Sequence, residues 1–221
     1  MARTRFRRKD LKRPDEFVSR GRQVILWAQQ NTQLLYRVGA AIVVVVIAVG
    51  GYFSVRTARV RQANEDLNRA LAEVRSGRYG EGAAQLADVA ARWSATTPGQ
   101  LATLYAASAD IKANNFDTAA LLLQDALDGR SWPPYLQQQA LVSLAFALDR
   151  KGDTAGAATR YGEASAIAGP YTAMAILGEA RGREQLGDKE GARKLYERLL
   201  REFPQAPESA IVTAKVGDLS Q

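Results

Sequence analysis

The sequence contains neither cysteine nor histidine. Disulfides, thiol nucleophiles, Ser-His-Asp triads and metal sites built on Cys or His are therefore excluded. A G-x-x-x-x-G-K-[ST] phosphate loop is also missing, and the glycines that follow Gly77 lack the preceding strand and the spacing of a dinucleotide-binding loop. Acid pairs such as Glu65-Asp66 and Asp188 with Glu190 are typical of solvated helix surfaces. We expect no enzymatic activity, no cofactor, no metal and no small-molecule substrate.

Strand-like alternation of apolar and polar residues is lacking as well. In contrast, residues 57–221 contain 34 alanines. Alanine is the best helix former, and its small side chain lets helix axes approach closely. The sequence therefore predicts an all-α protein.

Negative charge is scarce at the N-terminus. Residues 1–37 contain ten Lys or Arg and three acids, while residues 38–221 contain 20 bases and 20 acids, so the net charge of +7 lies in the first segment. We interpret residues 1–14 as a basic cytoplasmic tail. Residues 15–33 place Phe17, Val24 and Ile25 on one helical face, which indicates an amphipathic helix on the membrane surface. Nucleic-acid binding by the tail is the less favoured alternative, because Phe6 is the only aromatic residue interleaved with its bases and a membrane segment follows.

One long uncharged run is present, from Val38 to Val55. As a helix it spans about 27 Å, close to the thickness of the hydrocarbon core of a bilayer. A buried helix is disfavoured because no other segment is apolar enough to surround it, and a cleaved signal peptide because the run is long and no A-x-A-like site follows. We predict a transmembrane helix at residues 34–56, with residues 15–56 contacting lipid.

The orientation of this span depends on which charges dominate. Three bases lie within residues 18–37 and five within residues 56–75, which taken alone favours a cytoplasmic body. The dense basic cluster of residues 3–13 favours the opposite, and charges on a long folded domain count for less. We predict a cytoplasmic N-terminus and a body on the other side of the membrane.

Proline and turn residues recur with a fixed period in the body. Pro98, Pro134, Pro170 and Pro207 are 36, 36 and 37 residues apart, and each opens a helical pattern, where its missing N–H is harmless. Turn signals lie midway between them. They begin at Gly77, Asn114, Gly152 and Gly187, which are 37, 38 and 35 residues apart. The pattern predicts four helix–turn–helix repeats stacked as a solenoid, followed by a short final helix from Pro207.

The repeats resemble tetratricopeptide repeats. Repeat four, GDKEGARKLYERLLREFP, has the small residue at Ala192, the aromatic residue at Tyr196 and the helix-ending proline at Pro204. Ala157 and Tyr161 match in repeat three, whereas repeat one is degenerate and the early Trp of the family is missing. The resemblance implies a tetratricopeptide-like helical-hairpin solenoid over residues 57–221. We expect its C-terminal helix to cap the last hydrophobic face through Ala210, Ile211 and Ala214, with Glu208 and Lys215 outside.

A solenoid of this kind offers a concave surface for protein partners. The repeat register predicts that the following residues line it: Leu67, Leu71, Leu104, Ser108, Lys112, Val142, Phe146, Arg150, Met174, Leu177 and Arg181. An apolar floor with scattered cations suits extended or partly unfolded polypeptide. The alternative is that most of these apolar residues are ordinary core between repeats.

The order of parts resembles a known family: a basic tail, a surface helix, one span and a cysteine-free repeat domain. It is similar to the YfgM-like inner-membrane tetratricopeptide proteins, the ancillary subunits of the bacterial Sec translocon. This resemblance implies a bacterial inner-membrane protein with a periplasmic body, a chaperone-like adaptor whose partners are the translocon or secreted polypeptides. A structural scaffold or assembly factor for another envelope complex, serving division, export or outer-membrane assembly, is the alternative hypothesis.

Overall fold

The computed structural model describes residues 26–129 and 131–219, and every regular element within them is a helix. The chain divides into two compact units, Met1–Thr57 and Ala58–Gln221. Helix α2 (Thr32–Arg75) runs through the boundary, so its first part belongs to the first unit and its last part to the second. The sequence-based prediction of an all-α chain is confirmed.

The part of α2 in the first unit has the character of a membrane span. An 18-residue window has a mean hydropathy of 2.4, and none of it is buried by the rest of the protein. Val44, Val46 and Ile47 are about two-thirds exposed, which is unfavourable in water but suits a hydrocarbon environment. One helix is therefore apolar enough to cross a membrane. Residues 1–25, which contain the predicted tail and most of the predicted surface helix, lie outside the described residues.

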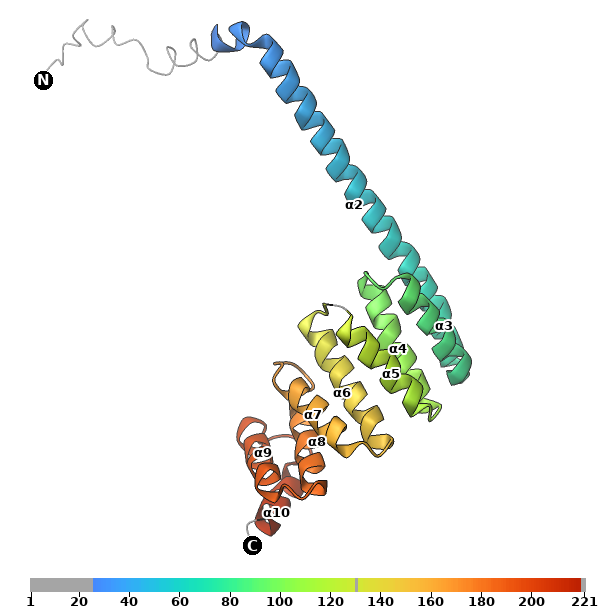
Figure 1. Cartoon of the computed structure of the whole chain (residues 1–221), viewed down its shortest axis with the longest axis vertical. Helices are drawn as coiled ribbons and strands as arrows, with labels where there is room; N and C mark the ends of the chain where they lie inside the picture. The colour runs from blue at the N-terminus through green and yellow to red at the C-terminus, as the bar shows by residue number, and fades with distance from the viewer. Residues whose placement is uncertain (1–25, 130, 220–221) are drawn as a thin grey trace, which may run out of the picture. The chain divides into compact units, whose positions relative to one another are not determined.

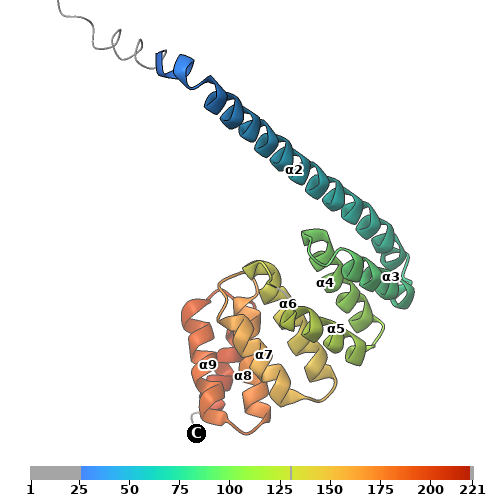
Figure 2. The same cartoon turned by 45° about the horizontal axis from the view of Figure 1, so that its top comes forward.

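The second unit consists of consecutive helical hairpins (Figures 1 and 2). The end of α2 pairs with α3, α4 with α5, α6 with α7 and α8 with α9, and α4 also contacts α6 of the next pair. These four pairs and α10 are the predicted four repeats and the final helix. The bounds are α3 Tyr79–Arg92, α4 Thr97–Lys112, α5 Phe116–Asp128, α6 Pro134–Arg150, α7 Thr154–Ser165, α8 Thr172–Gln185, α9 Lys189–Glu202 and α10 Ser209–Asp218.

The turn within each hairpin is made by the residue that the spacing predicts. Gly77, Gly152 and Gly187 have φ angles of 84°, 86° and 84°, and Asn114 has 63°. Among the described residues, Asn114 is the only non-glycine with positive φ. Glycine adopts this left-handed conformation without a steric penalty and asparagine tolerates it better than most residues, which explains why these two types occur there.

The prolines behave in two ways. Pro98 lies in the first turn of α4 and Pro134 is the first residue of α6, as predicted. Pro170 and Pro207 lie instead in the turns that precede α8 and α10, each two residues before its helix begins. The loop before α8 is held by other groups, described below, so its proline does not need to open the helix.

Alanine fills the contacts between paired helices. Ala107, Ala145 and Ala180 in the first helices, and Ala157 and Ala192 in the second, are at most 2% exposed. Ala157 and Ala192 are the small positions that the repeat pattern predicts. Larger side chains, including Leu86, Leu123 and Tyr196, pack around them in clusters that each span neighbouring helices. The close approach of the helices follows from the small side chains.

The prediction for the buried face of α10 is wrong. Ile211 is 63% exposed, and Ala210 and Ala214 are also exposed, whereas Val212 is buried at 1%. Val216 and Leu219 pack beside Val212 against the core of repeat four. The helix is rotated from the expected orientation so that these three apolar side chains face the core, and Lys215 binds Glu184 on α8.

Candidate protein-binding surface

The predicted surface residues of different repeats can be compared by their distance in sequence from the turn residue of their hairpin. Leu67, Leu104, Val142 and Leu177 all lie ten residues before their turns, at 77, 114, 152 and 187. All four are buried, with 4–8% exposed, and each belongs to a hydrophobic cluster. The structure places them in the core between helices, as the alternative interpretation expected, and they form no open apolar floor.

The residues six positions before the turn are more accessible. Leu71 is partly buried, whereas Ser108, Phe146 and Arg181 are exposed, Phe146 to 40%. They lie on the first helix of successive repeats, so their side chains repeat along one side of the solenoid. We call the exposed side of α4, α6 and α8 the first-helix face.

Two further apolar side chains belong to the first-helix face. Met174, which was predicted, is 55% exposed near the start of α8. Tyr105, which the sequence analysis missed, is 43% exposed on α4, one residue after the buried Leu104. Tyr105, Phe146 and Met174 therefore provide at least one exposed apolar group on each of three successive first helices.

The predicted cations Lys112 and Arg150 have structural partners. The Lys112 ammonium lies 5.3 Å from the centre of the Tyr79 ring, and the Arg150 guanidinium lies 5.2 Å from that of Phe116. Each is the last residue of a first helix and stacks on the first-turn aromatic of the preceding repeat. These contacts stabilise neighbouring repeats against each other. The equivalent pair in repeat four, Gln185 with Thr154, is a polar contact of 3.4 Å.

Two buried glutamines were missed by the sequence analysis. Gln138 is completely buried, and its amide Nε2 donates to the carbonyl oxygen of Ile167 at 2.6 Å and to Thr172 Oγ1 at 3.0 Å, while its Oε1 accepts from the Tyr171 N–H at 3.2 Å. Gln100 donates to the carbonyl oxygen of Ser131 at 3.2 Å. Both lie fourteen residues before a turn, so each ties its own repeat to the loop that enters the next.

A cleft of about 450 Å³ lies where α8, α9 and α10 meet, on the side of Arg181. Glu184 accepts from Lys215 at 2.5 Å and from the hydroxyl of Tyr196 at 2.8 Å. The Lys215 ammonium is the main cause of the lowered pKa of Glu184, and burial followed by the Glu184 contact raises the pKa of Tyr196. Among the described residues Arg181 forms no hydrogen bond or ion pair, so its guanidinium is available to an anionic group of a partner.

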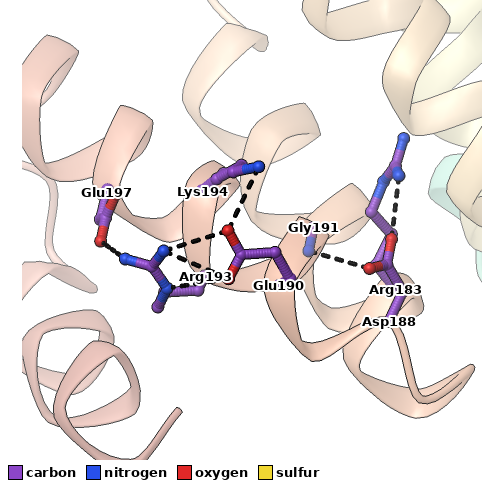
Figure 3. Close-up of polar contacts among 7 residues, drawn as sticks. All are labelled: Arg183, Asp188, Glu190, Gly191, Arg193, Lys194 and Glu197. Carbon is purple, nitrogen blue, oxygen red and sulfur yellow. Dashed lines mark hydrogen bonds and ion pairs between the residues drawn. The ribbon is translucent and has the colours of Figure 1, made fainter. Parts of the chain in front are cut away.

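The opposite side of repeat four is dominated by charge pairs (Figure 3). Arg193 on α9 bridges Glu190 and Glu197, and Lys194 also binds Glu190 at 3.2 Å. At the start of α9, Asp188 accepts from the Gly191 N–H at 2.9 Å and from Arg183 at 3.1 Å, which caps the helix and lowers the pKa of Asp188. Side chains committed to such pairs offer little to a partner.

The chemistry of the first-helix face is that of an interaction surface. It combines exposed apolar and aromatic groups with the hydroxyl of Ser108 and the cation of Arg181. Over the described part of the chain, no group of three or more acidic side chains is arranged to hold a metal ion. Such a surface can bind polypeptide through apolar contacts and hydrogen bonds.

Comparisons with known proteins agree with this architecture. The family model described as a tetratricopeptide repeat-like domain matches residues 26–221. No curated protein matches. The crystal structure of a tetratricopeptide repeat protein from Parabacteroides merdae ATCC 43184 superposes with a TM-score of 0.59 at 16% sequence identity, covering 72% of this chain and 60% of the other. That likeness concerns the fold. The match to the family model, which extends over most of the sequence, shows that this chain belongs to the tetratricopeptide repeat-like domain family.

Proposed function

We propose that this protein is a membrane-anchored interaction module whose repeat domain binds protein partners in the periplasm. Its N-terminal tail is cytoplasmic, residues 34–56 span the inner membrane and the body is a chaperone-like adaptor associated with the Sec translocon. The order of its parts supports this proposal, together with membership of a family whose repeats typically mediate contacts between proteins. The partner is a secreted polypeptide or a translocon subunit.

The observation that carries the proposal is the exposure of Tyr105, Phe146 and Met174 on successive first helices. Apolar groups aligned in this way lose contact with water when an extended chain lies along them. Arg181, at the end of the row, adds a cation that forms no hydrogen bond or ion pair with the described residues. Binding to a shallow surface must order a flexible chain, which offsets part of the contact energy. We therefore expect a micromolar dissociation constant, which corresponds to a binding free energy of about 8 kcal/mol in magnitude.

Replacement of Phe146 by serine tests the surface directly. With the full chain in detergent micelles, an unfolded polypeptide labelled with a fluorophore should bind about tenfold more weakly, while the melting temperature changes little because Phe146 is exposed. Leu121→Ser on α5 is the matched control, since Leu121 is 64% exposed but lies on a second helix. Equal binding by both variants and the unaltered protein would reject the first-helix face as the binding surface.

Orientation and partner are tested in cells. The protein contains no cysteine, so a single cysteine at Asp218 should react with an impermeant maleimide in intact spheroplasts if the body is periplasmic. A photo-crosslinking residue at position 146 should then capture translocon subunits or secreted proteins, identified by mass spectrometry. Labelling of the cysteine only after lysis would place the body in the cytoplasm and reject the translocon proposal.

A second function is favoured by the burial of Leu67, Leu104, Val142 and Leu177. The solenoid fills the space between its own helices, which suits a scaffold that presents a fixed outer surface to a folded envelope complex. In that case the photo-crosslinker at position 146 should capture one folded assembly in stoichiometric amounts, and the isolated chain should have no measurable affinity for unfolded polypeptide.

A further inference from the structure

A buried carboxylate distinguishes repeat four from its neighbours. Eight residues before the turn, repeats two and three have Ala106 and Leu144, which are at most 1% exposed and belong to the apolar core. Repeat four has Glu179 at this position, and it is only 8% exposed. Burial of a charged group is costly unless its hydrogen-bonding capacity is used, so the partners of Glu179 decide what it does.

Only one oxygen of Glu179 is engaged. Arg183 donates from Nε and Nη2 to Oε1, at 3.0 and 2.8 Å. Within the described residues, Oε2 has no hydrogen-bond donor. Gly162 on α7 leaves room for this oxygen. A Cβ atom at position 162 would lie 3.3 Å from Oε2, a distance shorter than most Cβ contacts. The carboxylate therefore keeps one acceptor unused beside a position without a side chain.

Glu179 forms part of the wall of a cleft of about 440 Å³ between α7 and α8. The cleft is lined by Ala155, Ala158, Thr159, Gly162, Glu179, Arg183, Leu186 and Asp188. Its ionisable groups are two carboxylates and one guanidinium, which leaves a charge of −1. Both oxygens of Asp188 are already occupied, by the Gly191 N–H and by Arg183 (Figure 3), so the unused acceptor is Glu179 Oε2.

This cleft is separate from the first-helix face. Glu179 and Arg181 are two residues apart on α8. Side chains with this spacing on an α-helix point in directions that differ by about 200°. The two side chains therefore serve opposite sides of the same helix, and each lines a different cleft.

We propose that the cleft between α7 and α8 is a second interaction site, which binds a lysine side chain of a protein partner. The ammonium group donates to Glu179 Oε2 and neutralises the negative charge of the cleft. Lysine fits better than arginine, because a guanidinium binds best to two free oxygens and only one is free here. The alanines at the rim accommodate the aliphatic stem of lysine, and Thr159 provides a hydroxyl beside it.

The test uses two peptides that differ by one charge. The full chain in detergent micelles, labelled with ¹⁵N-glycine, is titrated with acetyl-Ala-Ala-Lys-Ala-Ala-amide and with the same peptide acetylated on the lysine. The amide signals of Gly162 and Gly182, both at the α7–α8 contact, should shift saturably with the first peptide at millimolar concentration. The acetylated peptide should bind at least tenfold more weakly. Equal shifts for the two peptides would overturn the proposal.

Glu179→Gln should weaken binding of the lysine peptide at least tenfold, whereas the control Glu184→Gln on the opposite side of α8 should leave it unchanged. Thr159→Arg is the second variant if Glu179→Gln does not fold, because Thr159 is exposed and its replacement places a competing cation at the rim. Undiminished binding by folded Glu179→Gln or Thr159→Arg would contradict the proposal.

The source of the ammonium group is tested with n-butylammonium. Binding of n-butylammonium comparable to that of the lysine peptide is expected for a site that recognises a side chain. If n-butylammonium binds and the lysine peptide does not, the cleft takes a small free amine and the partner proposal is wrong. Neither result depends on binding at the first-helix face.

Discussion

Helices α6 and α8 occupy equivalent places in successive repeats, 35 residues apart, yet they are held differently. At three equivalent positions α6 has Gln138, Leu144 and Arg150, whereas α8 has Ala173, Glu179 and Gln185. The first set makes hydrogen bonds to the next loop, a fully apolar contact and a stack on an aromatic ring. In α8, Ala173 has only a methyl group, Glu179 is a buried carboxylate and Gln185 makes a polar contact of 3.4 Å with Thr154.

The difference shows that equivalent helices of a repeat protein can be held in place by different kinds of contact. Each repeat of a solenoid contacts only its neighbours, so a substitution acts on one junction without disturbing the others. The surroundings of α6 are optimised for packing. Around α8, Gly162, Gly178 and Gly182 let α7 and α8 approach closely, and among the described residues Arg181 and Glu179 Oε2 remain without a hydrogen-bond partner at two clefts.

Transplanting the carboxylate of α8 into α6 should have the largest effect. Leu144→Glu places a charge at a site that is 1% exposed and has no arginine four residues later. We expect a loss of about 4 kcal/mol in the free energy of unfolding, because an uncompensated buried charge is strongly destabilising. Urea denaturation followed by circular dichroism measures it. Gln137→Glu, on the exposed side of α6, is the control, and equal midpoints for the two variants would refute the contrast.

Removal of the buried side-chain amide of α6 should have the second-largest effect on the free energy of unfolding. Gln138→Ala leaves the Tyr171 N–H and the acceptors of the α7–α8 loop without their partner, and we expect a loss of about 3 kcal/mol. The loop residues should also exchange their amide protons faster. Gln137→Ala is the matched control. A midpoint for Gln138→Ala within error of that control would show that water replaces the side chain.

Alkaline pH should weaken the contact between α7 and α8. Burial, followed by the nearby Asp149 carboxylate, raises the pKa of Tyr161 to about 12, while its value in the unfolded chain is close to 10. The folded form therefore holds the proton more tightly, so the stability contributed by Tyr161 is complete below pH 10 and is lost as the pH rises towards 12. Tyr161→Phe keeps the ring against Gly178 and should have a shallower decrease of the urea midpoint over this interval. Parallel decreases for the two proteins would contradict this assignment.

The reverse transplant should have the smallest effect. Glu179→Leu gives α8 the residue of α6, and it leaves no buried charge unpaired because Arg183 is 44% exposed and keeps its ion pair with Asp188. We expect a change within about 1 kcal/mol, measured by the same urea denaturation. A loss as large as that of Leu144→Glu would show that the Glu179–Arg183 pair is required for folding.

The repeats, their turns and their small contact positions were predictable because they depend on local chemistry. Gly77 and its equivalents recur at nearly constant spacing, and only a few residue types accept their backbone conformation. The buried glutamines carried a usable signal as well, since Gln100 and Gln138 are separated by 38 residues, as are the turns that follow them.

The surface was harder to predict because exposure depends on helix rotation. The apolar side chains of Leu104 and Val142 are compatible with either the core or a groove. Lys112 and Arg150 lie two residues before their turns and Arg181 lies six residues before its own, so the predicted cations occupy two different positions in the repeat. The rotation of α10 follows from contacts with residues distant in the sequence, because Val212 packs in one cluster with Ile176 and Leu177. Lys215 and its partner Glu184 are likewise 31 residues apart.

The alanine at position 173 has a mechanical consequence. Gln100 and Gln138 fasten the loops that enter α6 and α8, but Ala173 has no side-chain amide to fasten the loop that enters α10. A force applied to the C-terminal residues should therefore peel α10 away at low load, before the hairpin of α8 and α9 detaches at a higher one. The solenoid should extend in steps from its C-terminal end, and the fastened hairpins should yield last.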